Sequence, residues 1–281
     1  MTATSATTRT EREQRTAFST LPVLRRWMAE GRRSLLGWSA GVAGVEVLYL
    51  PLFPSMQSPE LAELVASLPP ELVRTLGYGD ITSGAGYTQA TIFGLIGFVL
   101  LTIAGVSWGA AFIGGAEESG RLELTLSHGV GRVQYALESA GALAARIAGL
   151  GVVVFVVVAA LNGPCQLELD LGNLLAVTAA WVCLGLLSAT AALAVGAVSG
   201  RRSWGVGAGA GIAVVGYVLQ ALANNSESLD WLRRLSPYDW AFGTAPLTNG
   251  ADLPGLTLLV GASLVLVGAA TGALARRDVL G

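Results

Sequence analysis

The chain has 281 residues, of which 53% are hydrophobic and only 13% are charged, and its formal net charge is -2. A soluble domain carries about 25% charged residues, so a water-soluble fold could not cover this much apolar surface with a polar exterior. All 17 basic residues are arginine, and the lack of lysine excludes a P-loop nucleotide site in this chain, because that motif requires a lysine.

The amino-terminal region is polar and rich in arginine. Residues 1–17 are mostly Thr, Ser, Arg and Glu, so we expect a disordered cytosolic tail. Residues 18–33 place Phe18, Leu21 and Leu24 at helical spacing among arginines, which predicts an amphipathic helix at the inner membrane surface. A solvated basic leader is the alternative. No cleavable signal peptide is indicated, so we expect the first span to remain as an anchor.

Six apolar segments follow, and each is long enough to cross the hydrocarbon core, which takes about 20 helical residues. They cover residues 34–54, 88–113, 139–161, 172–199, 204–223 and 254–275. The sequence therefore predicts an all-α integral membrane protein whose residues 34–275 form one six-helix domain. Gly205, Gly207, Gly209 and Gly211 alternate in the fifth segment, which favours close packing against a neighbouring helix.

The arginines also predict the orientation, because basic residues concentrate in cytoplasmic loops. They cluster before the first span, after the second, between the fourth and fifth, and after the sixth. The opposite loops are acidic and contain only Arg74, Arg233 and Arg234. We therefore expect both termini in the cytosol of a bacterium, with the chain in its plasma membrane and residues 276–281 as a short cytosolic tail.

Two of the predicted outer loops are long. Residues 55–87 space their leucines and valines as in two short amphipathic helices, with a break at Pro69 and Pro70. Residues 224–253 contain several aromatic residues of the kind enriched at membrane interfaces, Trp231 and Trp240 among them. Short extracellular helices are therefore expected in the first and third outer loops.

The predicted cytosolic connection after the second span combines charges with one apolar helical face. An acidic pair precedes a glycine, and a short helix follows. The candidate contact residues on or beside this helix are Glu117, Glu118, Gly120, Leu122, Glu123, Leu126 and Arg132. Such a helix can dock into a groove on a partner protein; a solvated loop without a partner is the alternative.

At this place the sequence resembles the membrane subunits of ABC-2 type transporters. That family often shows Glu-Glu, then Gly-x-Leu-Glu, then Leu-Ser, then an arginine after its second helix, as Glu117 to Arg132 do here. A similar Ser-Pro-aromatic, Pro-Leu and Asn-Gly pattern runs from Ser236 to Gly250. With six spans the resemblance covers nearly the whole chain. It is greatest to actinobacterial-type permeases that export antibiotics and other hydrophobic compounds.

The resemblance implies a fold, a function and partners. Residues 116–132 would be the coupling helix, seated on a separate ATP-binding subunit through the acidic residues and Arg132, with Leu122 and Leu126 as apolar contacts. Two ATPase copies and a second permease, an identical one in the simplest case, would complete the complex within membrane lipid. ATP and Mg²⁺ would bind to the ATPase, so we expect no cofactor, metal site or enzyme site in this chain and no nucleic-acid partner.

One carboxylate, Glu46, lies well inside the first predicted span. A charge at the bilayer centre costs about 2.5–3.5 kcal/mol on insertion scales, so this side chain should face protein or a cavity. It could contact a substrate cation, carry a proton or pair with Arg146 of the third span. A protonated or paired residue that only locks the bundle is the alternative.

Two other functions stay open beside the ABC exporter. A secondary transporter would contain its own substrate and ion site, although the sequence has no convincing internal repeat of the kind common in such carriers. An ABC permease that serves an assembly or maturation pathway is the other hypothesis.

Overall fold

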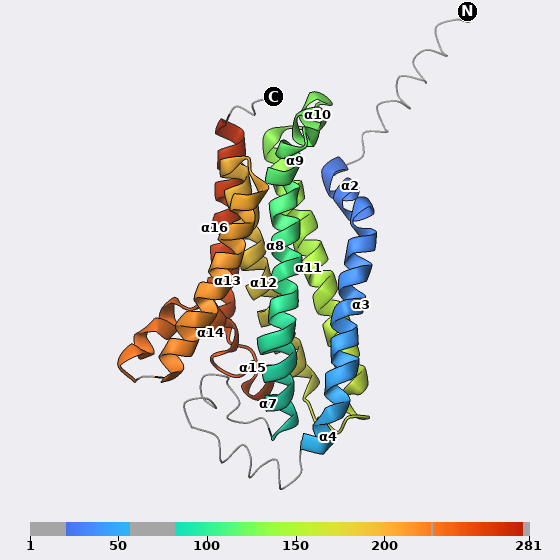
Figure 1. Ribbon diagram of the computed structural model, residues 1–281, viewed down its shortest axis with the longest axis vertical. Helices are drawn as coiled ribbons and strands as arrows, with labels where there is room; N and C mark the ends of the chain where they lie inside the picture. Colours follow the sequence, from blue (N-terminus) through green and yellow to red (C-terminus); the bar gives the residue numbers. More distant parts are fainter. Residues whose placement is uncertain (1–20, 57–81, 226, 278–281) are drawn as a thin grey trace, which may run out of the picture.

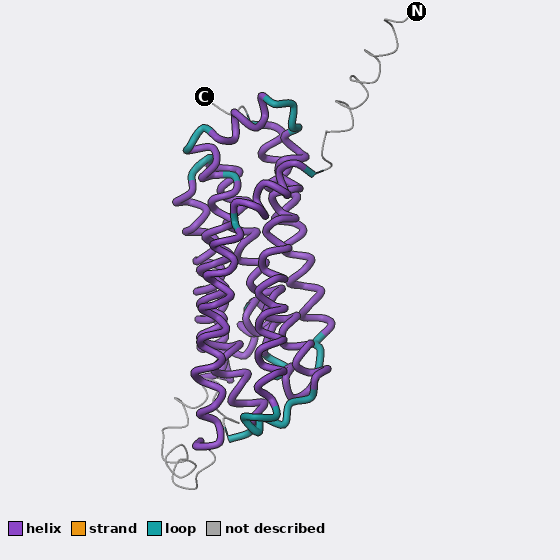
Figure 2. The backbone as a smooth tube through the Cα atoms, turned by 90° about the vertical axis from the view of Figure 1, so that its right-hand side faces the viewer, coloured by secondary structure: helices purple, strands orange, loops and turns teal. Residues whose placement is uncertain are grey.

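The protein consists of long helices packed side by side. The structure is a computed structural model, and it describes residues 21–56, 82–225 and 227–277. Within these residues the backbone is helical between short connections at the two ends of the bundle, and it contains no strand (Figure 1; Figure 2). The predicted all-α fold is therefore confirmed for the part of the chain that the structure describes.

Six helical stretches in the described residues are long and apolar enough to cross a membrane. They are Arg32–Ser55, Gly84–Phe112, Arg132–Asn162, Leu171–Ser199, Arg202–Asn225 and Leu253–Arg276. The prediction of six helices that are long and apolar enough to span a membrane is thus confirmed. The third span begins earlier than residue 139, because its first turns are helical but polar, and hydropathy marks only the apolar part of a helix.

The helices that make up these spans follow one another in alternating directions. The first contains α3 (Arg32–Tyr49), η1 (Leu50–Leu52) and α4 (Phe53–Met56), and the second contains α7 (Gly84–Thr88), the π-helical η2 (Gln89–Ile96) and α8 (Gly97–Phe112). The other four are α11 (Arg132–Asn162), α12 (Leu171–Ser199), α13 (Arg202–Asn225) and α16 (Leu253–Arg276).

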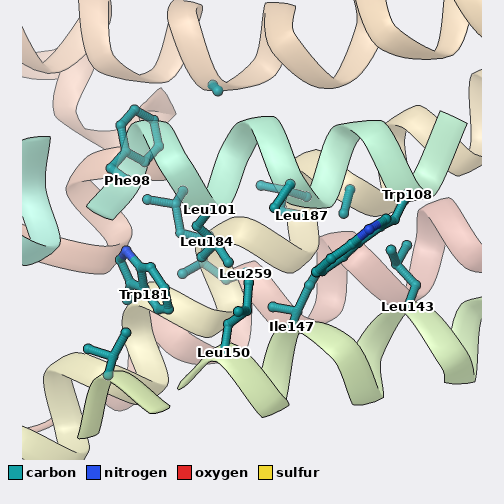
Figure 3. Packing of buried hydrophobic residues seen from close by; sticks show 14 of the residues in the cluster. Phe98, Leu101, Trp108, Leu143, Ile147, Leu150, Trp181, Leu184, Leu187 and Leu259 are labelled. Atoms are coloured by element: carbon teal, nitrogen blue, oxygen red, sulfur yellow. The ribbon is translucent and has the colours of Figure 1, made fainter. Parts of the chain in front are cut away.

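Helix α12 lies at the centre of the bundle and packs against α8, α11, α13 and α16. Its side chains Trp181, Leu184 and Leu187 are buried among Leu101 of α8 and Leu150 of α11 (Figure 3). Small residues bring the backbones close, since a Cβ at Gly109 of α8 would lie 2.2 Å from the carbonyl oxygen of Ala189. Helix α12 is therefore the most buried of the six long helices.

The alternating glycines of α13 divide into two faces. A Cβ at Gly205 would lie 2.6 Å from the carbonyl oxygen of Ala192, and one at Gly209 would lie 2.6 Å from that of Ser188. A Cβ at Gly207 or Gly211 would have nothing within 4 Å among the described residues. The predicted close packing is thus made by Gly205 and Gly209 alone.

A short helix, α2 (Pro22–Glu30), precedes the first span and is separated from it at Gly31. The Glu138 carboxylate accepts hydrogen bonds from the backbone N–H groups of Val23 (2.7 Å) and Leu24 (2.9 Å), which ties the start of α2 to α11. Val23 and Trp27 are buried in the protein. Val23 and Trp27 therefore attach α2 to the bundle, while Leu21 of the predicted apolar face is 50% exposed, and the position of this helix at the membrane surface stays a prediction.

The connection between α13 and α16 contains three short elements, η3 (Glu227–Leu235), α14 (Pro237–Phe242) and α15 (Pro246–Asn249). Ser236 caps α14, accepts from the Asp239 N–H and donates to the carbonyl oxygen of Gly216 at 2.7 Å. The Tyr238 hydroxyl donates to the carbonyl oxygen of Gly94 at 2.8 Å. The Ser-Pro-Tyr sequence thus fixes this connection to the second and fifth spans.

Several predicted segments fall wholly or largely outside the described residues. These are the tail at residues 1–17, the surface helices within 55–87 and the tail at 276–281, of which residues 57–81 and 278–281 are not described. These expectations stay predictions.

Candidate functional site

The connection after the second span forms two short helices at one end of the bundle. Helix α9 (Gly114–Glu118) continues from α8, and α10 (Arg121–Ser127) turns away from it at Gly120. Gly120 has a φ of 69°, a conformation that residues with a Cβ rarely adopt, so glycine allows the sharp turn between the two helices. Figure 1 shows α10 at the same end as α2 and the carboxyl end of α16.

Charged residues fasten α9 to the ends of three other helices. Glu117 forms an ion pair with Arg277, whose guanidinium also donates to the carbonyl oxygen of Val198 at 2.8 Å. Arg132 donates to the carbonyl oxygen of Arg277 at 2.9 Å. The Glu118 carboxylate accepts from the backbone N–H of Arg202 at 3.0 Å. We call Glu117, Glu118, Arg132, Arg202 and Arg277 the end cluster.

The end cluster brings together three residues that the sequence singled out, namely Glu117, Glu118 and Arg132. Only 13% of the Glu117 side chain is exposed, so this carboxylate pairs with an arginine of its own chain and is largely shielded from solvent. The sequence did not mark Arg277 as a site residue, because a basic residue after a last span is common. Its contacts with Glu117 and Val198 are seen only in the structure. These contacts connect α9 to the ends of α12, α13 and α16.

Helix α10 presents a different face to solvent than the sequence predicted. Leu122 is fully buried and Leu126 is half-buried, so the apolar face at this spacing seats α10 on its own bundle. Burial of Leu122 does not fit its predicted role as a contact for a partner. Leu124 is 59% exposed and is the large apolar residue that α10 offers to solvent. Glu123 is half-buried.

Arg146 holds the junction between α2 and α3. Its guanidinium donates to the carbonyl oxygen of Trp27 and lies over the rings of Trp108 (5.3 Å) and Phe112 (4.9 Å). It fills the space in which Gly31 would have a Cβ, so glycine is required there. The arginine is thus enclosed by aromatic rings and one carbonyl group.

Glu46 is also buried but lies elsewhere. Its side chain is 0% exposed, and neither carboxylate oxygen has a hydrogen-bond partner among the described residues. Glu46 follows Gly31, the neighbour of Arg146, by fifteen residues, or about 22 Å of helix. The predicted pair between Glu46 and Arg146 is therefore not formed, because the two groups lie at different depths.

The described residues include no group of three or more His, Cys, Asp or Glu side chains close enough to hold a metal ion. His128 follows α10 on the surface, with Nδ1 at 2.6 Å from the carbonyl oxygen of Leu124. Cys165 and Cys183 are free thiols. The candidate site thus consists of the end cluster, with one separate buried carboxylate, Glu46, inside the bundle.

Comparison with known proteins adds no assignment. No family model matches the chain, and no curated protein matches it significantly. Any functional conclusion must rest on the chain's own residues and their geometry.

Proposed function

We propose that this chain is the permease subunit of an ABC-2 type exporter, which moves a hydrophobic or amphiphilic compound across a bacterial plasma membrane. A separate ATPase in two copies supplies the energy, and two permease copies line the path. In this proposal both termini and α10 lie in the cytosol, in agreement with the arginine-rich loops.

One observation carries the proposal: the end cluster links α9 to the ends of three spans. A force applied to α10 by a partner reaches α9 through Gly120 and then α16 through the ion pair between Glu117 and Arg277. The same force reaches α13 through the hydrogen bond from the Arg202 N–H to Glu118. Such a connection is what a coupling helix needs, because coupling requires a physical link between two states of the bundle.

Co-purification with an ATPase tests the proposal. A tagged copy of this chain is expressed with the ATP-binding subunit that we expect from an adjacent gene, and the complex is reconstituted in liposomes. We expect the two chains to co-purify in equal amounts and the complex to show vanadate-sensitive ATP hydrolysis. A chain that retains no ATPase under these conditions contradicts the proposal.

A variant of the exposed face of α10 sharpens this test. Leu124→Asp should reduce ATPase retention about tenfold or more, since an exposed apolar contact is replaced by a charge that a docking groove would have to desolvate. Leu235→Asp is the matched control, because Leu235 is 56% exposed and lies in η3, at the opposite end of the bundle. Equal retention in both variants would remove α10 as the docking helix.

A second candidate, an ion-coupled secondary transporter, is favoured by Glu46. A carboxylate that is fully buried and has no partner among the described residues suits a proton or cation site within a membrane. Transport that continues without the ATPase, collapses with an ionophore and is lost in Glu46→Gln would support this candidate. Normal transport in Glu46→Gln would leave Glu46 as a buried, protonated packing residue.

A further inference from the structure

A groove of about 570 Å³ opens between α2, α10 and the first turns of α11. Its floor is apolar and aromatic: Val23, Trp27 and Tyr135 line it, and each is less than a tenth exposed. Its rim contains the exposed side chains of Arg26 from α2 and Arg121 from α10. The groove thus joins an apolar surface to two cationic groups that come from different helices.

Among the described residues that line this groove, none has a carboxylate. The Arg121 guanidinium lies 5.9 Å from the ring centroid of Trp27, and Arg26 Nη1 lies 3.4 Å from Thr125 Oγ1 of α10. Three acids lie nearby. Glu30 forms an ion pair with Arg26 at 2.8 Å, and Glu138 accepts from the N–H groups of Val23 and Leu24. Glu123 is half-buried in α10, two residues from Arg121. The rim thus places two guanidinium groups beside an apolar floor, and a ligand that is anionic at one end and apolar at the other would compete with Glu30 for Arg26.

The depth of the groove indicates where such a ligand would come from. If α11 leaves the hydrocarbon core at Asn162, the core begins about 20 residues earlier, near Leu143. The Trp27 indole donates to Ser139, four residues and about 6 Å beyond that boundary. Headgroups occupy a layer of about 5–8 Å on each side of the core, so the floor of the groove lies at headgroup level.

We propose that this groove binds the headgroup of an anionic phospholipid. Arg26 and Arg121 hold the phosphate, and the glycerol and first methylene groups of the lipid pack on Trp27 and Val130. Free phosphate would use the two arginines but leave the apolar floor uncovered, which favours a lipid. The proposal concerns this chain alone and does not depend on the exporter function.

Lipid binding to the purified chain tests the proposal. The full chain in neutral detergent is titrated with phosphatidylglycerol, and bound lipid is counted by native mass spectrometry. The variant Arg26→Gln with Arg121→Gln should raise the Kd about tenfold or more, since each arginine near an anionic lipid surface contributes appreciably to binding. Arg25→Gln with Arg201→Gln is the matched control, because both side chains are exposed, neither lines the groove and the change in net charge is the same.

A second measurement locates the lipid. Phosphatidylglycerol with bromine near the top of its acyl chains should quench the part of the fluorescence that is lost in Trp27→Phe, and phosphatidylcholine with the same label should not. Equal Kd values for the two double variants overturn the proposal, as do equal binding of both lipids or displacement by millimolar inorganic phosphate. If the Arg26 and Arg121 variant instead loses the ATPase while it keeps phosphatidylglycerol, the groove is a protein-docking site and the lipid proposal is wrong.

Discussion

Arg277 forms an ion pair with Glu117, and this contact joins the end of the sixth span to the connection that follows the second. The two residues are 160 positions apart in the sequence. Both side chains are largely shielded from solvent, with 27% of Arg277 and 13% of Glu117 exposed. The ion pair is therefore a tertiary contact that closes one end of the bundle.

Loss of this ion pair should destabilise the bundle. Arg277→Gln leaves Glu117 partly buried without its partner, and we expect a loss of about 1–3 kcal/mol, between the values for exposed and buried pairs. Thermal unfolding in detergent measures the effect. Arg276→Gln, an exposed neighbour with the same change in charge, serves as the control and should unfold close to the wild type. Equal losses in both variants would show that the pair contributes nothing specific.

Arg146 should hold α2 against the bundle. In Arg146→Gln the carbonyl group of Trp27 and the rings of Trp108 and Phe112 lose their cation, so α2 should loosen. Limited trypsin digestion should then cut after Arg25 and Arg26 several times faster, while cutting near Arg201 stays unchanged. Arg33→Gln, which changes an exposed residue, is the control. Unchanged digestion at α2 in the Arg146 variant would argue against this role.

The two glycine faces of α13 should respond differently to an added methyl group. The Cβ added in Gly209→Ala would lie 2.6 Å from the carbonyl oxygen of Ser188, which is too close, so α12 and α13 must separate. We expect a loss of about 1–3 kcal/mol, as for other overpacked cores. Gly207→Ala meets nothing within 4 Å and should cost no stability. Comparison of the two unfolding temperatures decides the matter, and a reversed order would contradict the packing described for α13.

Stability should also depend on the ionisation of Asp239 in α14. Burial raises the pKa of this carboxyl group above its ordinary value of 3.8, although Arg233 at 3.6 Å opposes the rise. The folded state therefore binds the proton of the Asp239 carboxyl group more tightly than the unfolded state does. As a result, the free energy of unfolding falls as the pH rises from the ordinary pKa through the raised pKa.

Asp239→Asn removes this titration. The difference in unfolding temperature between variant and wild type should grow in favour of the variant from about pH 4 to about pH 7. Glu168→Gln is the control, because Glu168 is exposed and is not among the groups that act on Asp239. A difference for Asp239→Asn that stays constant with pH would show that the carboxyl group titrates normally.

Local sequence was sufficient for the spans but not for the relationships between them. Hydropathy is a property of one segment, so α12 and α13 could be delimited within a few residues. Register between helices is not a property of one segment. Glu46 lies about thirteen residues into the predicted span 34–54 and Arg146 about eight residues into the predicted span 139–161, so the two side chains could be expected to pair. The start of α11 packs beside α2 and not beside α3, so Arg146 meets Gly31, about four turns from Glu46.

The candidate site shows the same limit. The spacing of Leu122 and Leu126 correctly marks one face of a helix, but a periodic pattern does not say whether its own bundle or a partner covers that face. Full burial of Leu122 shows that the bundle covers it. Arg277 could not be identified at all, because its role depends on a residue near the middle of the chain.

The position of Arg277 has a consequence for how the protein is made. Glu117 is synthesised long before the sixth span. Its ion pair with Arg277 can therefore form only after α16 and the residue that follows it have been made. In a chain whose last span is not inserted, Glu117 lacks its contact with Arg277, whereas Glu118 keeps its contact with the Arg202 N–H. The ion pair between Glu117 and Arg277 therefore forms only after the last span is in place, so this end of the bundle is completed by the final step of assembly.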